Sequence, residues 1–212
     1  RTQVKIFTDR YFAYAGMAPD SSVGFGVGRY QLDTGNRIIE YNIYSSRALD
    51  STQIFHIKMT RTDSGYTQVI PDLATVGGVK YSETEVYSKV PSASTSKIDG
   101  LWLLDSAYSV KGKDTTVEHE VQYKIYWGGH FLFVHRYRVI PQSPVFKNGF
   151  GYGTFSLEND TLSEEDDLTN HAVLLNRQFA IKINFRSENE YTQVITDDQT
   201  GERSVEVYKK IE

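Results

Sequence analysis

The sequence contains no cysteine, and only 5 of its 212 residues are proline. Without cysteine the chain can form no disulfide bond, no thiolate zinc site and no cysteine nucleophile. No apolar run approaches the roughly 18 residues of a membrane-spanning helix, so we expect no transmembrane segment. The net charge of −4 comes from interspersed charges of both signs, which excludes the basic surface typical of nucleic-acid-binding proteins.

Aromatic residues, by contrast, are abundant, with 15 Tyr and 11 Phe. These residue types, together with Val, Ile and Thr, favour the half-buried surfaces of β-sheets. Apolar and polar residues alternate in many short segments, such as 177–186, and no helical stripe longer than two turns appears. Turn signals occur at 33–36 and 158–160. The pattern predicts an all-β protein of short antiparallel strands joined by tight turns.

A repeat of five sequence blocks relates the two halves of the chain. The letters YTQVI, for instance, occur twice, 125 residues apart, and the offset between matching blocks drifts only from 119 to 125. Such drift is typical of loop insertions between fixed strands, and the repeat has the size of a domain, so we predict two tandem copies of one domain. The matching blocks are 4–14 with 123–133, 24–32 with 149–157, 55–60 with 179–184, 66–70 with 191–195, and 85–90 with 206–211.

A small, polar segment separates the two copies. We predict a first domain at 1–90, a linker at 91–97 and a second domain at 98–212. The second copy opens with a strand at 98–108, whose counterpart in the first copy would precede Arg1. We expect that this strand was lost by truncation, the alternative being a strand borrowed from elsewhere. Because residue 1 is not Met, we also expect a trimmed chain from which any targeting segment is gone.

Three glycines at alternate positions recur in both copies. They are Gly24, Gly26 and Gly28, and then Gly149, Gly151 and Gly153. Alternate residues lie on one face of a strand, and glycine weakens a strand, so three in succession need a structural reason. Sharp coiling at the corner of a closed barrel supplies it, because side chains on the concave face would collide there. The alternative is a phosphate-binding loop, but such loops carry GxGxxG and open a helix.

The second copy begins with GLW at 100–102, at the start of an antiparallel meander. This motif resembles the GxW opening of the lipocalins and the wider calycin group, and the later blocks resemble small bacterial lipocalin-like proteins of uncharacterised function. The resemblance covers 98–212 and, without its first strand, 1–90. It implies two tandem antiparallel meander β-barrels and export to the periplasm, the cell surface or the medium. It brings no catalytic residues, so we predict neither an enzyme nor a cofactor.

The same resemblance implies structural roles for three residues. In the calycin pattern the Trp of GxW packs across the closed end of the barrel, often beneath a cation from a late strand. Gly100 and Trp102 match this motif, and Lys210 or its neighbour Lys209 would supply the cation. The alternative is an exposed lysine at the end of the chain.

The histidines and acidic residues lack the spacing of a metal or catalytic site. The histidines are His56, His119, His130, His135 and His171. On a strand His130 and His135 face opposite sides, and neither HxH nor HExxH occurs. No GxSxG marks a serine nucleophile. The acidic run 164–167 is typical of a solvated edge rather than of a carboxylate pair or a calcium loop. We therefore predict no metal site and no catalytic residues.

The interior of the second barrel is the candidate ligand site. Alternation predicts these inward residues: Trp102, Leu104, Ser106 and Tyr108; Tyr123, Ile125 and Trp127; Phe131, Phe133, His135 and Tyr137; Phe155 and Leu157; Phe179, Ile181 and Ile183. Such a lining is typical both of a pocket for a small apolar or amphiphilic ligand and of a filled core. If the barrel is hollow, the predicted ligand contacts are Tyr108, Tyr123, Trp127, Phe133, His135 and Tyr137.

An interaction module is the alternative function. Filled barrels would then present aromatic side chains, such as Tyr11, Tyr14 and Tyr152, to a protein or glycan partner. The repeated YTQVI raises a related choice, because Gln68 and Gln193 either present an amide to a ligand or lie in strands with the same neighbours. Packing on both faces of a strand explains why five consecutive residues are identical in the two copies. Contact with a pocket would explain identity only at alternate positions. The oligomeric state and the identity of the ligand stay open.

Overall fold

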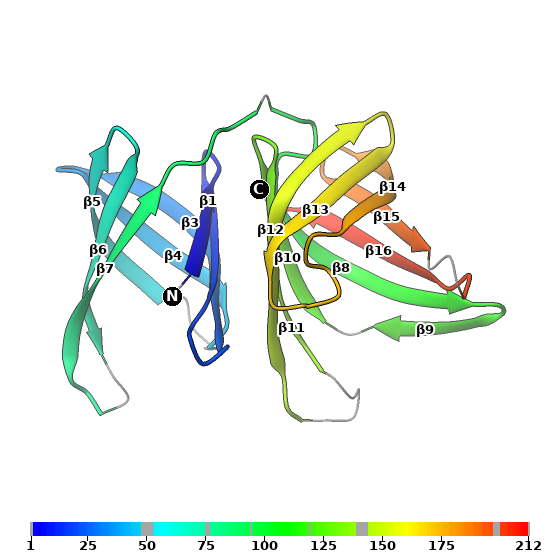
Figure 1. Ribbon diagram of the computed structural model, residues 1–212, viewed down its shortest axis with the longest axis horizontal. Helices are drawn as coiled ribbons and strands as arrows, with labels where there is room; N and C mark the ends of the chain where they lie inside the picture. The colour runs from blue at the N-terminus through cyan, green and yellow to red at the C-terminus, as the bar shows by residue number, and fades with distance from the viewer. Residues whose placement is uncertain are drawn as a thin grey trace.

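The computed structural model describes residues 2–47, 53–74, 77–93, 95–118, 120–138, 144–196 and 200–211. Within these ranges the chain forms sixteen β-strands in two antiparallel sheets that lie side by side (Figure 1). No helix in the described part of the chain is long and apolar enough to cross a membrane. The predicted all-β class is confirmed, and so is the arrangement of two β units in tandem.

The first sheet contains seven strands in chain order and curls into an open half-barrel. Its strands are β1 (Thr2–Phe7), β2 (Tyr11–Met17), β3 (Val23–Asp33), β4 (Arg37–Ser45), β5 (Gln53–Thr62), β6 (Gly65–Ala74) and β7 (Lys80–Ser88). Short turns at 8–10, 34–36 and 63–64 connect β1 to β2, β3 to β4 and β5 to β6. Gly35 and Asn36, with φ values of 68° and 58°, form the turn predicted between β3 and β4.

The second sheet closes into an eight-stranded barrel. Its strands are β8 (Gly100–Lys111), β9 (Asp114–Glu118), β10 (Val121–Trp127), β11 (His130–Tyr137), β12 (Lys147–Glu158), β13 (Thr161–Thr169), β14 (Gln178–Ser187), β15 (Glu190–Thr196) and β16 (Arg203–Lys210). The strand β8 closes the ring because it pairs with β10 on one side and with β16 on the other. β9 forms a hairpin with the far end of β8. The first sheet has no equivalent of β8, as predicted, and it remains open.

The two sheets share one pattern of strand pairing. Lys58 lies opposite Val69 in the first sheet, and Lys182 lies opposite Val194 at the same place in the second. Both sheets also carry a bulge at the same position, between β3 and β4 and between β12 and β13. The drift in the sequence offset therefore falls in the turns and bulges, and the strands themselves stay in register.

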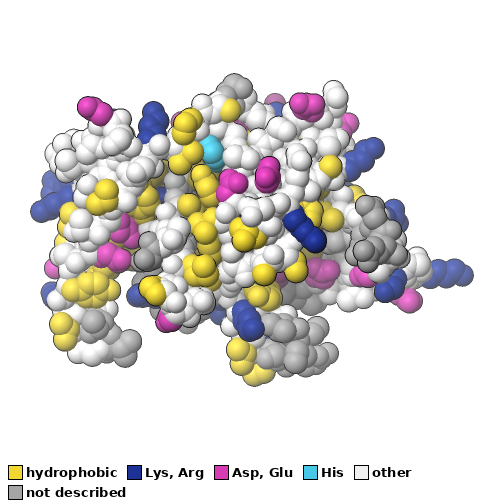
Figure 2. Space-filling view, viewed as in Figure 1, with side chains coloured by type: hydrophobic (Ala, Val, Ile, Leu, Met, Phe, Trp, Pro, Cys, Tyr) yellow, Lys and Arg dark blue, Asp and Glu magenta, His cyan; other side chains and the backbone are white. Residues whose placement is uncertain are grey.

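The outer faces of the two sheets pack against each other and form a shared hydrophobic core. The buried residues of this core are Ile6, Ala13, Ala15, Phe25 and Val27 from the first sheet, and Leu101, Ile125, Leu132, Val134 and Phe150 from the second. The hydroxyl of Tyr44 donates a hydrogen bond to the carbonyl oxygen of Val121 at 3.0 Å across this junction. Figure 2 shows hydrophobic side chains gathered along the junction. Neither sheet therefore buries its outer face alone.

The segment between the sheets lies against the barrel. The backbone N–H of Ala93 donates to the carbonyl oxygen of Gly128 at 2.7 Å, and a ring nitrogen of His130 lies 2.8 Å from the carbonyl oxygen of Pro91. The described residues of 91–97 thus run past the turn between β10 and β11.

The shared core corrects the inward positions predicted for β10. Tyr123, Ile125 and Trp127 pack into the shared core, and Lys124 and Tyr126 face the barrel interior instead. Both faces of β10 are buried. The face with Tyr123 and Trp127 packs against the first sheet, and the face with Tyr126 lines the barrel. Alternation gives the two faces of a strand but does not say which one is concave.

A bulge corrects the inward positions predicted for the second half of β8. The pairing with β16 shifts at this bulge, where Asp105 is the extra residue. A one-residue shift moves all later side chains to the other face. Ala107 therefore lies in the barrel core, and Ser106 and Tyr108 face outward.

Candidate functional site

The interior of the closed barrel holds polar side chains together with its apolar core. Six of them form what we call the barrel polar cluster: Gln122, Lys124, Glu164, Gln193, Glu206 and Tyr208. They come from β10, β13, β15 and β16, at positions where the strand alternation faces inward. Buried polar groups require partners, so their contacts decide what this interior can do.

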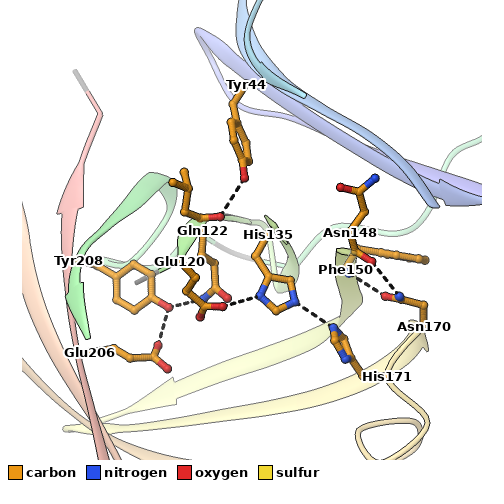
Figure 3. A network of polar contacts seen from close by, with 11 residues as sticks. Tyr44, Glu120, Gln122, His135, Asn148, Phe150, Asn170, His171, Glu206 and Tyr208 are labelled. Atoms are coloured by element: carbon orange, nitrogen blue, oxygen red, sulfur yellow. Dashed lines mark hydrogen bonds and ion pairs between the residues drawn. The ribbon is translucent and has the colours of Figure 1, made fainter. Parts of the chain in front are cut away.

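Hydrogen bonds connect four members of the cluster, three of which, Gln122, Tyr208 and Glu206, are labelled in Figure 3. The amide nitrogen of Gln122 donates to the hydroxyl of Tyr208 at 2.5 Å, and this hydroxyl donates to Oε2 of Glu206 at 2.6 Å. The amide nitrogen of Gln193 donates to the same carboxylate oxygen at 2.7 Å. Burial raises the pKa of Glu206 above its ordinary value, although Lys124 and the hydroxyl of Tyr208 oppose the shift.

The other two members form a buried ion pair. Nζ of Lys124 lies 3.3 Å from both carboxylate oxygens of Glu164, and the hydroxyl of Tyr126 donates to Oε1 of Glu164 at 2.5 Å. Lys124 and Glu164 are only 5% and 6% exposed. Each of them depends on the other, because a single buried charge without its partner is strongly unfavourable.

The first sheet carries the same six residue types at equivalent positions. This first-sheet polar cluster consists of Gln3, Lys5, Glu40, Gln68, Glu85 and Tyr87. Gln68 donates to Glu85, as Gln193 does to Glu206, and Lys5 pairs with Glu40, as Lys124 does with Glu164. The duplication therefore preserved a buried polar arrangement as well as the strands around it.

One contact differs between the two clusters. In the first sheet, Nζ of Lys5 also donates to Oε1 of Gln68 at 3.4 Å. In the barrel, Oε1 of Gln193 is buried and has no hydrogen-bond partner among the described residues. The barrel thus leaves one acceptor open that the first sheet satisfies with an ammonium group.

A cavity of about 360 Å³ lies beside the barrel polar cluster and opens to solvent. Its volume falls within the range of small-molecule pockets. The residues that line it are Gln122, Lys124, Phe133, His135, Glu164, Asp166, His171, Val173, Leu174, Phe179, Ile181, Gln193, Ile195 and Glu206. The concave face of the half-barrel has a smaller hollow of about 140 Å³ beside the first-sheet cluster.

Asp166 is the second buried acceptor without a partner in this cavity. Its side chain is 3% exposed, and its Oδ1 accepts no hydrogen bond among the described residues. Burial, followed by repulsion from Glu164, raises the pKa of Asp166 from its ordinary value of 3.8 to about 7, against the attraction of Lys124. The cavity therefore contains a carboxyl group that changes charge near neutral pH.

The alternate glycines of β12 make room for the side chains of the cavity. A Cβ at Gly149 would lie 2.2 Å from Nε2 of His135 and 2.4 Å from Nε2 of His171. A Cβ at Gly151 would lie 2.2 Å from Oδ1 of Asp166. At Gly153 the collision, at 1.7 Å, would be with the backbone oxygen of Glu165 in the bulge. The first two glycines thus accommodate cavity side chains, and the third accommodates strand curvature.

Two histidines and a carboxylate form a chain of contacts beside the cavity (Figure 3). Nδ1 of His135 lies 3.0 Å from Oε2 of Glu120, and Nε2 of His135 lies 2.9 Å from Nε2 of His171. Burial lowers the pKa of His171, and the neighbouring His135 lowers it further. A proton on Nδ1 of His135 that points to Glu120 leaves Nε2 of this ring as an acceptor for a proton on Nε2 of His171.

The structure brings together only part of the predicted ligand contacts. Phe133 and His135 line the cavity. The ring of Tyr137 stacks on His135 at 4.8 Å but lies outside the cavity lining. Tyr123 and Trp127 belong to the shared core, and Tyr108 faces outward, for the reasons given above.

Trp102 lies in the barrel core and is fully buried. Its indole nitrogen donates to the carbonyl oxygen of Ile98 at 2.7 Å. Nζ of Lys210 lies 5.2 Å from the centre of the indole ring, whereas Lys209 forms an ion pair with Asp105. Gly100 has a φ of 138°, and a Cβ there would lie 2.4 Å from Cε of Lys210, so glycine lets the lysine reach the ring.

Burial corrects the prediction for the acidic run. Glu165 and Asp167 are exposed, as expected for a solvated edge, but Glu164 and Asp166 are buried and line the cavity. In the part of the chain that the structure describes, no group of three or more His, Asp or Glu side chains is arranged to hold a metal ion. His119 lies outside the described residues.

The tyrosines considered for an aromatic surface are all partly buried. Tyr11 and Tyr152 pack against the shared core, and Tyr14 lines the hollow of the half-barrel. Tyr11 and Tyr152 thus lie at the junction of the two sheets, whereas Tyr14 lies on the concave side of the half-barrel.

Comparison with known proteins gives no family for this chain. No protein-family model matches the sequence, and no curated protein is similar to it. The fold and the site therefore rest on the geometry described above.

Several cavity residues escaped the sequence analysis, above all Lys124 and Asp166, whereas Gln193 was considered as a residue that presents its amide to a ligand. A usable signal exists within the repeat, because the same Gln, Lys, Glu and Tyr recur at alternate positions of matching blocks. TQVK and VQYK keep the inward Gln and Lys and vary the outward residues, and EVY in both last strands keeps the inward Glu and Tyr.

Proposed function

We propose that this chain is a lipocalin-like binding protein whose closed barrel holds a small amphiphilic molecule and does not react with it. The observation that carries the proposal is the cavity of about 360 Å³, in which the buried acceptors of Asp166 and Gln193 have no donor among the described residues. A buried polar atom without a partner costs about 1–3 kcal/mol. A ligand that donates hydrogen bonds to these two oxygens would recover that free energy.

The remaining walls suit the apolar part of such a ligand. Beside Phe133 the cavity is bordered by five aliphatic or aromatic side chains: Val173, Leu174, Phe179, Ile181 and Ile195. An apolar wall with a few convergent polar groups is the usual composition of a small-molecule pocket. The GLW opening and the closed antiparallel meander support the lipocalin-like part of the proposal, which includes export from the cell.

Acid–base catalysis is the second candidate, because the pKa of Asp166 lies near 7. Burial is the main cause of that shift, and it acts on any carboxyl group in this position. The described lining of the cavity contains no Ser, Thr or Cys that could act as a nucleophile beside it. We therefore favour binding over catalysis.

Binding of the neutral fluorescent probe N-phenyl-1-naphthylamine tests the proposal. We expect its fluorescence to increase on addition to the protein, and the substitution Ile195→Trp, which fills the cavity, to weaken binding at least tenfold. Ile54→Trp is the matched control, because Ile54 is 55% exposed on the first sheet. Equal binding by both variants would place the probe outside the cavity and refute the proposal. Native mass spectrometry of the protein from its host then identifies a retained molecule.

A further inference from the structure

More acidic than basic side chains surround the cavity among the described residues. Three carboxyl groups border it, those of Glu164, Asp166 and Glu206, and Lys124 is its single Lys or Arg among the described lining residues. The ammonium group of Lys124 is held by both oxygens of Glu164 at 3.3 Å. With His171 neutral, the interior has an excess of negative charge and of hydrogen-bond acceptors.

The unsatisfied acceptors lie on two different strands that face this cavity. Asp166 is in β13 and Gln193 in β15, and both side chains are at least 97% buried, with exposures of 3% and 1%. The amide nitrogen of Gln193 already donates to Glu206, which fixes the amide so that Oε1 is its free end. Both groups require a donor, and neither has one in the described protein.

The first sheet shows which chemical group satisfies such an oxygen. There the amide oxygen of Gln68 accepts a hydrogen bond from the ammonium group of Lys5. The equivalent Lys124 makes no such hydrogen bond to Gln193, and its ammonium group lies 3.3 Å from both oxygens of Glu164. In addition, the residue equivalent to Asp166 in the first sheet is Asn42, which lies opposite Gly28 as Asp166 lies opposite Gly153. Oδ1 of both residues has no partner among the described residues, but the side chain of Asn42 is neutral. The barrel thus has one more negative group and one less ammonium contact.

We propose that the ligand of the barrel is an organic cation: an apolar body that carries a protonated amine, with the ammonium group donating to Asp166 and Gln193. This inference rests on the proposed function and names the class of its ligand. An ammonium group supplies three donors and one positive charge, which satisfies both oxygens and balances the ionised carboxylate. A carboxylate ligand would face Glu164, Asp166 and Glu206 and be repelled.

Binding of such a cation depends on the charge of Asp166. The groups that face Asp166 are Glu164 and Asp167 on its own strand and Lys124 on β10, with Glu206, His135 and His171 elsewhere around the cavity. Glu164 and Asp167 favour the protonated carboxyl group and Lys124 favours the ionised one. Since the pKa of Asp166 is about 7 without ligand, amine binding strengthens between pH 6 and pH 8.

Three probes of one chain length test the ligand class: octylamine, 1-octanol and octanoate. Each displaces N-phenyl-1-naphthylamine from the full chain, at pH 6 and at pH 8. At pH 8 we expect octylamine to bind at least tenfold more tightly than octanoate and several-fold more tightly than 1-octanol. Asp166→Asn should weaken octylamine binding about tenfold and leave 1-octanol binding within twofold. Glu165→Gln is the matched control, since it removes a carboxylate charge from an exposed position of the same strand.

The outcomes separate the two proposals. If octanoate binds as tightly as octylamine, or if Asp166→Asn leaves octylamine binding unchanged, the cation proposal is refuted and the binding function stands. If no octyl compound and no reporter binds, the binding function itself is refuted. Binding of 1-octanol by Asp166→Asn shows that this variant keeps its cavity, and the natural Asn42 shows that asparagine fits at this position of the repeat.

Discussion

The two halves of this molecule contain the same buried cluster in two different enclosures. In the half-barrel, Gln3 reaches from β1 to Glu85 on β7 at 2.9 Å, and the neighbouring hollow measures about 140 Å³. In the barrel, β8 stands between β10 and β16, and the cavity measures about 360 Å³. The enclosure with the additional strand thus has the larger cavity, and in it the amide oxygen of Gln193 has no partner among the described residues.

The comparison also assigns different tasks to the two clusters. In the first sheet Gln68 has partners at both ends of its amide, and the amide nitrogen of Gln3 links the edge strands β1 and β7, although Oε1 of Gln3 has no partner among the described residues. In the barrel the cluster is incomplete at Gln193 and Asp166. We infer that the first copy serves to hold the fold and that the second copy serves to bind.

The largest effect is expected from removing the buried lysine of the barrel. Lys124→Met leaves Glu164 as an uncompensated buried charge, which should lower the free energy of unfolding by about 3–5 kcal/mol. The double substitution Lys124→Met with Glu164→Leu should recover most of this loss, because an apolar pair needs no charge compensation. Urea unfolding of the two variants and the wild type measures the coupling. A double variant that is no more stable than Lys124→Met would contradict the ion-pair assignment.

A large effect is also expected in the core that joins the two sheets. Leu132→Ala removes a fully buried side chain at the junction and should cost about 3 kcal/mol. Both sheets should still unfold in one transition, since neither buries its outer face alone. Fluorescence of the two tryptophans, both in the second sheet, and far-ultraviolet circular dichroism of the whole chain would then give coincident curves. The control is Leu32→Ala, because Leu32 is 76% exposed and should change stability by no more than about 0.5 kcal/mol.

Asp166→Asn should stabilise the free protein in a pH-dependent manner. The pKa of Asp166 rises from 3.8 in the unfolded chain to about 7 in the folded protein, so the folded state binds the proton more tightly. Stability attributable to this group is therefore greatest below pH 4, declines as pH rises towards 7, and stays low above it. We expect the variant to gain about 2 kcal/mol at pH 8, after allowance for solvent screening, and nothing at pH 3.5.

The measurement is the difference in urea midpoint between Asp166→Asn and the wild type at the two pH values. Asn42→Asp is the reciprocal variant, and it should lose stability at pH 8, because it adds a carboxyl group beside the buried Glu40. A gain from Asp166→Asn that does not depend on pH would show that the carboxyl group is not the cause.

The smallest effect is expected at the lysine over Trp102. Lys210→Met removes a cation–aromatic contact with the buried ring and should cost about 1 kcal/mol. Lys209→Met should change stability less, because the side chain of Lys209 is exposed and its ion pair with Asp105 is solvated. Thermal unfolding of both variants compares them directly, and an equal loss would place the contribution outside the contact with the ring.

Sequence patterns predicted the strands well, and the candidate site only in part. The turn at Gly35 and Asn36 and the pairing of matching blocks follow from local residue preferences, which are the same in any tertiary context. The positions of Tyr123 and Tyr108 were mistaken for long-range reasons. The first packs against another sheet, and the second follows a bulge that depends on pairing with β16.

The sequence by itself determined that this chain is all-β, that its two halves repeat the same series of strands, and that the first half contains no counterpart of β8. These features depend on alternation, on turn residues and on the repeat, which are properties of neighbouring residues. Only the tertiary structure decided which face of each strand is concave, that the two sheets share a core, and that Asp166 and Gln193 meet one cavity without donors. Those outcomes depend on contacts between residues far apart in the chain. The free energies of such contacts leave no pattern in the local sequence.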